Sequence, residues 1–257
     1  MKKQSKAIRR MGFIRDQEGI MNRYLRESSR WKEHLERTRS FISGSFRHTG
    51  AESAAVLGSG WLLDVPLDDL LGRFRHIYLV DIHHPIQIRK KTASLSQVEL
   101  IEEDLSGGII EQVWHTVPGP ESALTDGPDP AQFTWTPPLS RINPDVLISV
   151  NLLNQLDILL CDYLLKKKHF QQEALVPFRR AIQSFHLDWI SRKPGCLVTD
   201  VREEVWDKSG IKTSKTLIYA RLPDGIRQEH WWWDFDSLGT YHPESRTRME
   251  VQALEWE

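Results

Sequence analysis

Short apolar segments alternate with amphipathic helical segments between residues 54 and 190, and this alternation constrains the fold more than any other feature. Each strand-like run is followed by a helical one; the runs are residues 54–57, "HIYLVD", "VELIEED" and "PDVLISV". Connections of this kind join parallel strands through right-handed crossovers. The sequence therefore predicts an α/β fold with an open, mostly parallel sheet and helices on both faces.

The last quarter of the chain has a different pattern. A fifth strand, "CLVTDV", is followed by the strand-like segments "KTLIYARL", "EHWWWDF" and "RMEVQALEW". No crossover helix fits between these segments, so we expect antiparallel pairing at the C-terminal edge of the sheet. Trp231 and Trp233 would share one face of their strand, with Trp232 on the other, and we expect all three to pack in the core.

The N-terminal segment is predicted to be a long amphipathic helix. Its apolar residues recur near helical spacing, at Ile20, Tyr24, Trp31, Leu35 and Ile42. Residues 1–48 also contain thirteen Lys or Arg against five Asp or Glu, and we expect these charges to coat the solvent face. Nucleic-acid binding through this basic arm stays an alternative, recognisable by an affinity that falls steeply with salt.

Composition excludes several other classes. No apolar stretch approaches the length of a membrane span, and the N-terminus lacks the apolar core of a secretory signal, so we expect a cytoplasmic protein without membrane contact. Cys161 and Cys196 have no spacing suited to zinc and predict neither a metal site nor a disulfide framework. Residues 118–138 hold six prolines and predict an irregular loop, either a lid or a surface insertion.

A glycine turn, Gly58-Ser59-Gly60, follows the first strand and precedes a helix predicted near residues 65–73. Such a turn lets backbone approach a ligand, while the helix N-terminus offers free N–H groups. Leu63 occupies the position where the GxGxxG dinucleotide fingerprint needs a small residue, which disfavours NAD. Asp64, with Pro66 after it, is expected to cap the helix.

Three polar residues lie at the carboxyl ends of predicted strands, the edge at which open α/β sheets bind ligands. Asp81, which is 21 residues after Gly60, is placed to accept hydrogen bonds from ribose hydroxyls, and Asp104 can reach an adenine amino group. Asn151 ends the fourth strand. Structural alternatives stay open for each: Asp81 could start a turn, and Asp104 and Asn151 could cap the helices that follow them.

Residues 54–257 resemble the class I, Rossmann-like S-adenosylmethionine-dependent methyltransferases. The similarity is carried by "VLGSG", "LVD", "EEDL", "PDVLISVNLL" and "KPGCLVTDV" in the family's order, and "GSGWLLDVPL", "LVDIHHP" and "SVNLLNQL" resemble a group of bacterial methyltransferase-like proteins without an assigned substrate. The resemblance implies a helical extension over residues 1–50, a methyltransferase domain over residues 51–257 and S-adenosyl-L-methionine as cofactor. The implied cofactor-binding residues are Gly58, Ser59, Gly60, Asp81, Ile82, Asp104, Leu105, Asn151 and Leu152.

The resemblance also bears on the methyl acceptor. "SVNLLNQL" lacks the Asp/Asn-Pro-Pro-aromatic signature of methylation on nucleic-acid bases, so we expect a small-molecule acceptor. In this class, segments before the first strand often fold over the cofactor. By that analogy we expect Tyr24 and Arg26 to approach the pocket, with Arg26 available to bind a carboxylate or phosphate.

No fixed catalytic motif is expected, because the cofactor supplies an activated methyl group and the protein mainly aligns the acceptor. His83, His84, Asp200 and His242 are the candidate proton acceptors, and a metal shared by the adjacent histidines is not expected. The alternative to an enzyme is a non-catalytic Rossmann-like module that binds a nucleotide or serves assembly. The oligomeric state stays open.

Overall fold

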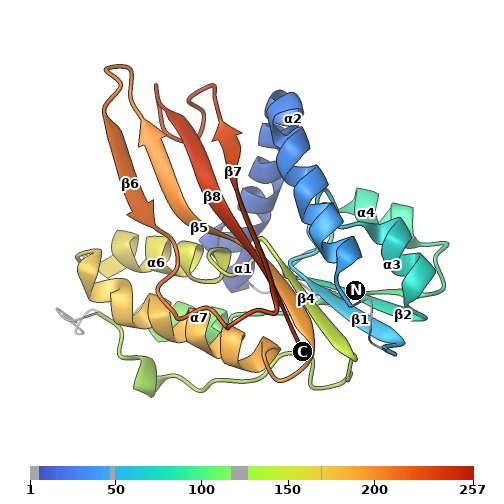
Figure 1. The fold of residues 1–257 in the computed structure, drawn as a ribbon. Coiled ribbons are helices and arrows are strands. Elements are labelled where there is room, and N and C mark those ends of the chain that lie inside the picture. The colour runs from blue at the N-terminus through green and yellow to red at the C-terminus, as the bar shows by residue number, and fades with distance from the viewer. Residues whose placement is uncertain (1–5, 47–49, 117–126, 169) are drawn as a thin grey trace.

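A single mixed sheet organises the computed structural model, which describes residues 6–46, 50–116, 127–168 and 170–257 (Figure 1). Within these residues the sheet has eight strands in the order β3-β2-β1-β4-β5-β8-β7, and β6 pairs with the distal half of β5. The strands are β1 Ser53–Leu57, β2 His76–Asp81, β3 Val98–Glu102, β4 Val146–Val150, β5 Gly195–Trp206, β6 Lys212–Thr216, β7 Arg227–Asp236 and β8 Arg246–Trp256.

Strands β1 to β5 are parallel, and β6, β7 and β8 join them by antiparallel pairing. This arrangement confirms the predicted Rossmann-like fold with an antiparallel C-terminal edge. The central strand β1 shows why its sequence is apolar at nearly every position. Ala54 and Val56 face one core while Ala55 and Leu57 face the other, so both faces of the strand are buried.

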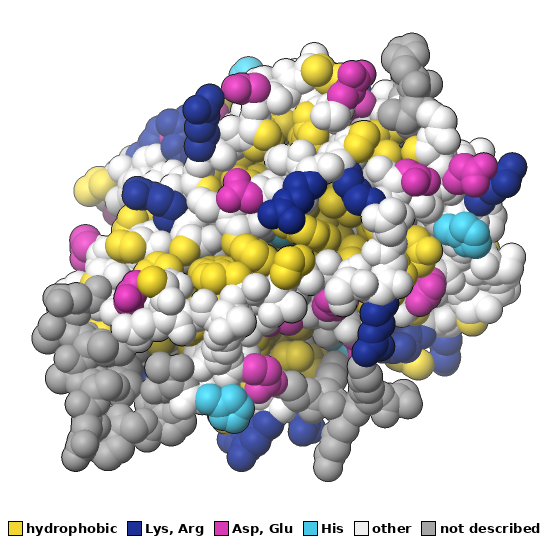
Figure 2. Space-filling view, turned by 90° about the horizontal axis from the view of Figure 1, so that it is seen from below, with side chains coloured by type: hydrophobic (Ala, Val, Ile, Leu, Met, Phe, Trp, Pro, Cys, Tyr) yellow, Lys and Arg dark blue, Asp and Glu magenta, His cyan; other side chains and the backbone are white. Residues whose placement is uncertain are grey.

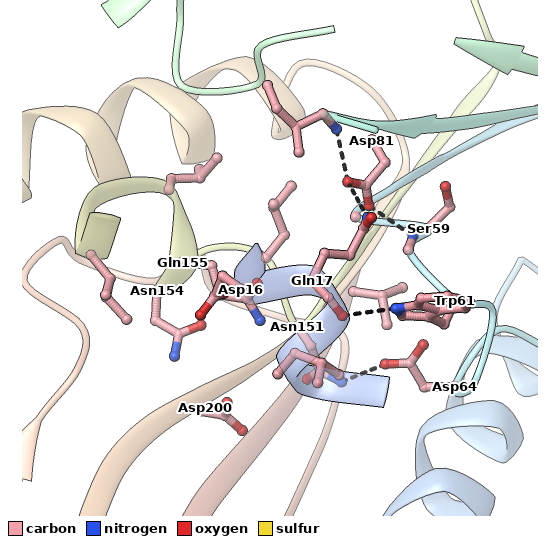
Figure 3. A pocket seen from close by; sticks show the side chains of 18 of the residues that line it. Asp16, Gln17, Ser59, Trp61, Asp64, Asp81, Asn151, Asn154, Gln155 and Asp200 are labelled. Carbon is pink, nitrogen blue, oxygen red and sulfur yellow. Dashed lines mark hydrogen bonds between the residues drawn. The ribbon is translucent and has the colours of Figure 1, made fainter. Parts of the chain in front are cut away.

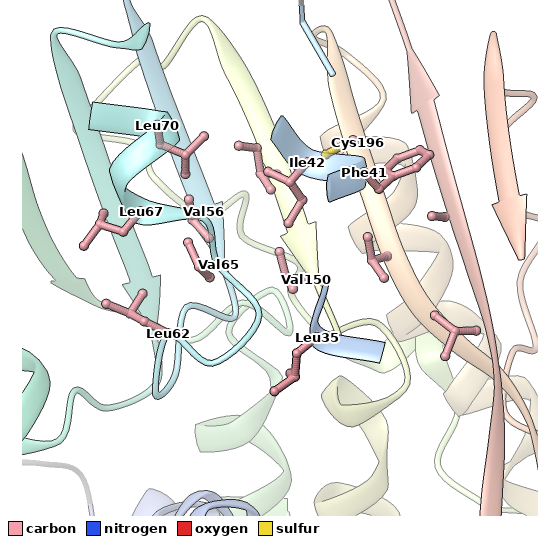
Figure 4. Packing of buried hydrophobic residues seen from close by; sticks show 14 of the residues in the cluster. Leu35, Phe41, Ile42, Val56, Leu62, Val65, Leu67, Leu70, Val150 and Cys196 are labelled. Atoms are coloured by element: carbon pink, nitrogen blue, oxygen red, sulfur yellow. The ribbon is translucent and has the colours of Figure 1, made fainter. Parts of the chain in front are cut away.

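Helices cover both faces of the sheet (Figure 1). Side chains of α2, α3 and α4 join the first core, and those of α1, α5, α6 and α7 join the second. Figure 4 shows the first core, in which Leu35 and Ile42 from α2 lie beside Val56 and Val150 of the sheet. The helices are α1 Lys6–Met11, α2 Phe13–Gly44, α3 Leu67–Arg73, α4 Ile86–Thr92, α5 Ile109–Thr116, α6 Gln155–Lys168 and α7 Val176–Ile190, with short 3₁₀ helices η1 Pro130–Gln132 and η2 Glu173–Leu175.

The long helix α2 has the amphipathic character that its sequence predicts. Trp31 is 1% exposed, and its indole Nε1 donates to the carbonyl of Phe235 in β7 at 2.9 Å. On the outer face, Arg37 pairs with Glu33 at 3.1 Å. The helix therefore shares the core of the sheet through one face while its charges meet solvent, as expected.

The C-terminal strands extend beyond the parallel part of the sheet, as Figure 1 shows for β5, β6, β7 and β8. Trp231 and Trp233 are buried against α2, as predicted. The prediction is wrong for Trp232, which is 37% exposed and lies 3.9 Å from the Arg248 guanidinium, because helix α2 covers only the opposite face here. The strand expected over residues 215–222 is also wrong, since β6 ends at Thr216.

Other expectations concern the surface and the proline-rich loop. Figure 2 shows apolar side chains at the centre of one face, with basic and acidic side chains mixed around them. No helix in the described ranges is long and apolar enough to cross a membrane.

Within the predicted loop, residues 127–138 contain only η1 as regular structure, and residues 117–126 lie outside the described residues.

Candidate functional site

A cavity of about 250 Å³ lies at the carboxyl edge of the parallel strands (Figure 3). Its walls come from the segments after β1, β2, β3 and β4, from the middle of β5, and from α2, β7 and β8. The structure brings all nine residues of the predicted cofactor set to this one cavity, namely Gly58, Ser59, Gly60, Asp81, Ile82, Asp104, Leu105, Asn151 and Leu152.

The glycine turn packs closely against the end of β4. Gly58 has a φ of +80°, and a Cβ built on it would lie 2.7 Å from the carbonyl oxygen of Val150 and 2.9 Å from the Cβ of Leu152. Both distances are too short for a side chain, and the positive φ also favours glycine. Gly58 therefore lets the β1 and β4 ends approach each other at the cavity wall.

The backbone N–H groups of this turn all donate hydrogen bonds to acceptors within the protein. Gly58 and Ser59 donate to the carbonyl of Val80 at 2.9 and 3.2 Å, and Gly60 donates to Asp81 Oδ2 at 2.7 Å. The helix predicted near residues 65–73 is observed as α3, Leu67–Arg73, but none of its residues lines the cavity, so the expectation that its N-terminus offers free N–H groups to a ligand is wrong. The turn forms no cradle of free N–H groups of the kind that binds phosphate.

The intervening segment, residues 61–66, is held away from helical structure by its burial. Leu62, with a φ of +56°, and Val65 pack in the first core, and the indole Nε1 of Trp61 donates to the carbonyl of Gln17 at 2.8 Å. These contacts tie the segment to the sheet and to α2.

Asp81 lies partly buried at the end of β2, and desolvation raises its pKa to about 6 against the lowering effect of its hydrogen bonds. Its carboxylate accepts from the N–H groups of Gly60 and Ile82, the latter at 2.8 Å. Gln17 Nε2 also donates to Asp81 Oδ1, at 3.1 Å, and to the carbonyl of His83, at 2.9 Å. Figure 3 shows this first part of α2 lying across the cavity with Gln17 directed at Asp81.

Asp104 combines the two roles that its sequence position allows. Its carboxylate accepts from the N–H of Ser106 at 2.9 Å and of Ile110 at 3.3 Å, which fixes the start of α5. The residue also lines the cavity, beside Ile82 and Leu105. Burial raises the pKa of this carboxyl. The structural alternative of helix capping is therefore correct for Asp104, and it coexists with a place in the cavity.

Asn151 and Asp64 bond to each other instead of capping helices. Asn151, with a φ of +46°, donates from Nδ2 to Asp64 Oδ2 at 2.6 Å. The cap predicted for Asp64 is wrong, since Pro66 occupies that position without a side-chain bond. Capping by Asn151 is not observed either, because its amide turns toward Asp64 and the buried His34. Burial raises the pKa of Asp64.

His34 packs at the back of this polar pair. Its Nδ1 accepts from the indole Nε1 of Trp231 at 3.1 Å, and its ring stacks on Trp233 with centroids 3.9 Å apart. Burial lowers the pKa of His34 to about 3, so the ring is neutral. The neutral His34 ring therefore forms a flat, uncharged part of the cavity wall.

Among the four candidate proton acceptors, only Asp200 lines the cavity. His83 lies outside it and bonds to Glu102 at 2.9 Å, and His242 bonds to Glu203 at 3.1 Å. His84 is buried between α4 and β3, where its Nε2 lies 3.1 Å from the carbonyl of Ile101. The described residues contain no cluster of His, Cys, Asp or Glu able to hold a metal ion.

The structure does not bring Tyr24 and Arg26 to the cavity. Tyr24 packs near Trp31 with ring centroids 5.9 Å apart, and Arg26 is exposed. Arg23 lines the cavity instead, with its guanidinium 4.6 Å from the ring centroid of Phe235. A helix turns 100° per residue, so Arg26 lies about 140° around α2 from Trp31, whereas Arg23 lies about 80° away.

Other cavity residues gave no usable sequence signal. The α2 residues Asp16 and Gln17 lie in a stretch rich in charge, and the aromatic wall comes from strands far along the chain. The cavity residues that sequence reasoning missed include Asp16, Gln17, Arg23, His34, Asp64, Asn154, Trp233, Phe235, Tyr241 and Met249.

No protein-family model matches this chain, and no curated protein sequence matches it. Among solved structures, it is similar to the N-methyltransferase NodS from Bradyrhizobium japonicum WM9 in complex with S-adenosyl-L-homocysteine, with 11% identity, a TM-score of 0.40, and 86% of this chain and 85% of that chain covered. DhpI in a SAM-HEP complex shares 10% identity at a TM-score of 0.36, with 96% and 99% covered. The methyltransferase domain of a bacterial Hen1 shares 12% identity at a TM-score of 0.36, with 86% and 100% covered. Identity at this level does not establish a shared activity.

Proposed function

We propose that this protein transfers a methyl group from S-adenosyl-L-methionine to a small molecule bound in the same cavity. One observation carries the proposal: the predicted cofactor residues come from the ends of four different strands and meet in a single cavity. Parallel strands end at a common edge of the sheet, which is where open α/β folds bind their ligands. The proposal assigns cofactor binding to this set.

The hydrogen-bonding pattern favours an adenosine-containing ligand without phosphate. Asp81 is an acceptor for ribose hydroxyls, and Ile82, Asp104 and Leu105 form the wall on which an adenine ring would lie. Because the N–H groups of the glycine turn already donate to Val80 and Asp81, the turn has no free donor for a pyrophosphate. S-Adenosylmethionine fits this combination, whereas a dinucleotide does not.

The charge of the cavity supports the same ligand. Six carboxyl groups line it against one guanidinium, that of Arg23; the six are Asp16, Asp64, Asp81, Glu103, Asp104 and Asp200. A cleft lined mainly by acids attracts cations and repels phosphates. S-Adenosylmethionine carries a positive sulfonium, so the field of the cavity suits it.

The contribution of the protein to the reaction is alignment and exclusion of water. When bound, S-adenosylmethionine supplies a methyl group that is already activated for in-line displacement. Helix α2 covers the site through the bonds of Gln17 and Trp61, and the buried walls hold the acceptor in one orientation. A proton acceptor beside the nucleophile completes what this chemistry needs.

Calorimetric titration with S-adenosylmethionine and S-adenosylhomocysteine tests the proposal. We expect micromolar binding to the wild type, weakened by roughly 30-fold or more in Asp81→Ala, because a charged hydrogen-bond acceptor contributes about 2 kcal/mol. Asp188→Ala removes an exposed acid on α7 and serves as the matched control. Absence of binding to the wild type would contradict the proposal and favour the non-catalytic module. Equal affinities for Asp81→Ala and wild type would remove Asp81 from the site.

A further inference from the structure

Three acceptor oxygens that line the cavity have no hydrogen-bond partner among the residues that the structure describes, namely Oδ1 of Asp200, Asn154 and Asn151, and two donors of the lining, Arg23 Nε and Trp233 Nε1, are unpaired as well. Two of the three acceptors belong together: Asp200 and Asn154 are both 5% exposed, and their side chains bond to each other. Buried polar atoms are nearly always paired, because leaving one unpaired costs about 1–3 kcal/mol and more for a charged group. The unpaired acceptor oxygens of Asp200 and Asn154 therefore indicate a ligand that donates hydrogen bonds to them.

The backbone places these two side chains beside each other. Asp200 lies in β5 two residues past Val198, the last residue to pair with β4, and the register with β8 shifts between Asp200 and Arg202. A bulge of this kind redirects a side chain and is common next to ligand sites. Asn154 lies in the turn before α6, and its amide hydrogen-bonds to the Asp200 carboxylate. Figure 3 shows both residues on the same side of the cavity.

The surroundings of Asp200 are acidic and aromatic. Burial raises the pKa of Asp200, and the negative charges of Asp64, which follows β1, and of Glu203 in β5 raise it further. Tyr241, from the segment between β7 and β8, lines the same cavity, and burial together with the charge of Glu203 and Asp200 raises the pKa of its phenol. The guanidinium of Arg23 lies 5.0 Å from the centroid of the Tyr241 ring.

The remaining walls are apolar. Trp233, Phe235 and Met249 line the same cavity and belong to the first hydrophobic core. Aromatic faces also attract cations, particularly in a desolvated site. An occupant with an apolar body and a cationic N–H donor group matches both the aromatic walls and the unpaired acceptors.

We propose that Asp200 and Asn154 form the methyl-acceptor subsite and that the acceptor is a primary or secondary amine carried on an apolar body. This inference rests on the proposed methyltransferase function and assigns its substrate class. The amine enters as an ammonium ion, whose N–H groups donate to Asp200 Oδ1 and Asn154 Oδ1. Alcohols offer one donor and no charge, and carboxylates offer neither, so the subsite discriminates against both.

Asp200 also accounts for the proton that methylation of an amine releases. The ammonium gives one proton to the Asp200 carboxylate, and the lone pair exposed on nitrogen attacks the methyl carbon. One carbon–nitrogen bond forms and one carbon–sulfur bond breaks, with the electron pair of the broken bond left on sulfur as a neutral thioether. Burial raises the pKa of Asp200 to about 7, which suits a group that exchanges protons near neutral pH.

Ligand-observed NMR tests the subsite without requiring turnover. The protein is saturated with S-adenosylhomocysteine at pH 8, and the affinities of 2-phenylethylamine, 2-phenylethanol and phenylacetate are compared. We expect the amine to bind about tenfold or more tightly than the alcohol, and phenylacetate to bind weakest. In Asp200→Asn this preference for the amine should fall below about threefold. Asn154→Leu, which removes the second acceptor at similar volume, should reduce it as well.

The controls separate this inference from the proposed function. Asp188→Asn, an exposed acid on α7, should keep the full amine preference, and Asp200→Asn should keep the wild-type affinity for S-adenosylhomocysteine. A wild type that binds the alcohol as well as the amine would overturn the inference. So would an Asp200→Asn variant that loses S-adenosylhomocysteine instead of the amine, because Asp200 would then belong to the cofactor. If S-adenosylhomocysteine does not bind while the Asp200-dependent amine preference persists, the methyltransferase proposal fails and the amine site stands.

Discussion

Replacing Asp200 by Asn should raise the free energy of unfolding, and by more at pH 8 than at pH 5. The carboxyl is 5% exposed, and one of its oxygens has no partner among the described residues. Burial is the largest cause that raises its pKa from the ordinary value of 3.8 to about 7, and the nearby carboxylates of Asp64 and Glu203 add to the rise. The folded state therefore prefers the protonated form, whereas the unfolded chain releases the proton above pH 4.

The sign and size of the effect follow from proton linkage. Between pH 3.8 and pH 7 the unfolded chain binds fewer protons at this group than the folded protein, so the wild type loses stability as the pH rises through that window. With these two pKa values the loss is about 2 kcal/mol at pH 5 and about 4 kcal/mol at pH 8. Asparagine has no such titration, so the stability difference between variant and wild type should grow by about 2 kcal/mol between pH 5 and pH 8.

Urea unfolding of both proteins at pH 5, 6, 7 and 8 measures this difference. Other raised carboxyls, such as Asp81 and Asp157, are present in both proteins and largely cancel in the comparison. Asp188→Asn, which removes an exposed acid on α7, is the matched control. Parallel curves for Asp200→Asn and wild type would refute the reasoning, since the Asp200 carboxyl would then titrate alike in the folded and unfolded chains.

Three further changes test the packing. Gly58→Ala should destabilise the fold by about 2 kcal/mol or more in urea unfolding, because its Cβ would lie 2.7 Å from a backbone oxygen at a positive φ; a neutral change would contradict the close approach of β1 and β4. Arg179→Met should cost about 3 kcal/mol or more by the same assay, because Asp157 would stay buried without its ion-pair partner, and a loss below 1 kcal/mol would show that the pair is dispensable. Cys161 and Cys196 are buried with raised thiol pKa values, so iodoacetamide at pH 8 should label neither until the protein unfolds; rapid labelling of the native protein would contradict their burial.

The sequence by itself determined the parallel part of the sheet and the place of the cavity. Strand and helix periodicities are local, and polar residues at strand ends such as Asp81, Asp104 and Asn151 can be found by inspection. Once the strands are known to be parallel, their carboxyl ends must share one edge, so the convergence of these residues needed no coordinates. The glycine at position 58 could also be recognised from the sequence, although the reason that glycine is required there is a contact with Val150.

Tertiary structure alone decided which polar groups are paired and which are left to a ligand. Hydrogen bonds at the site join residues far apart in the chain, as in Gln17 with Asp81, Asn151 with Asp64, and Trp231 with His34. A sequence pattern carries no information on such partners, because it is packing that sets the distance and burial of each pair. For the same reason, the consumption of the glycine-turn N–H groups and the unpaired oxygen of Asp200 became visible only in the folded chain.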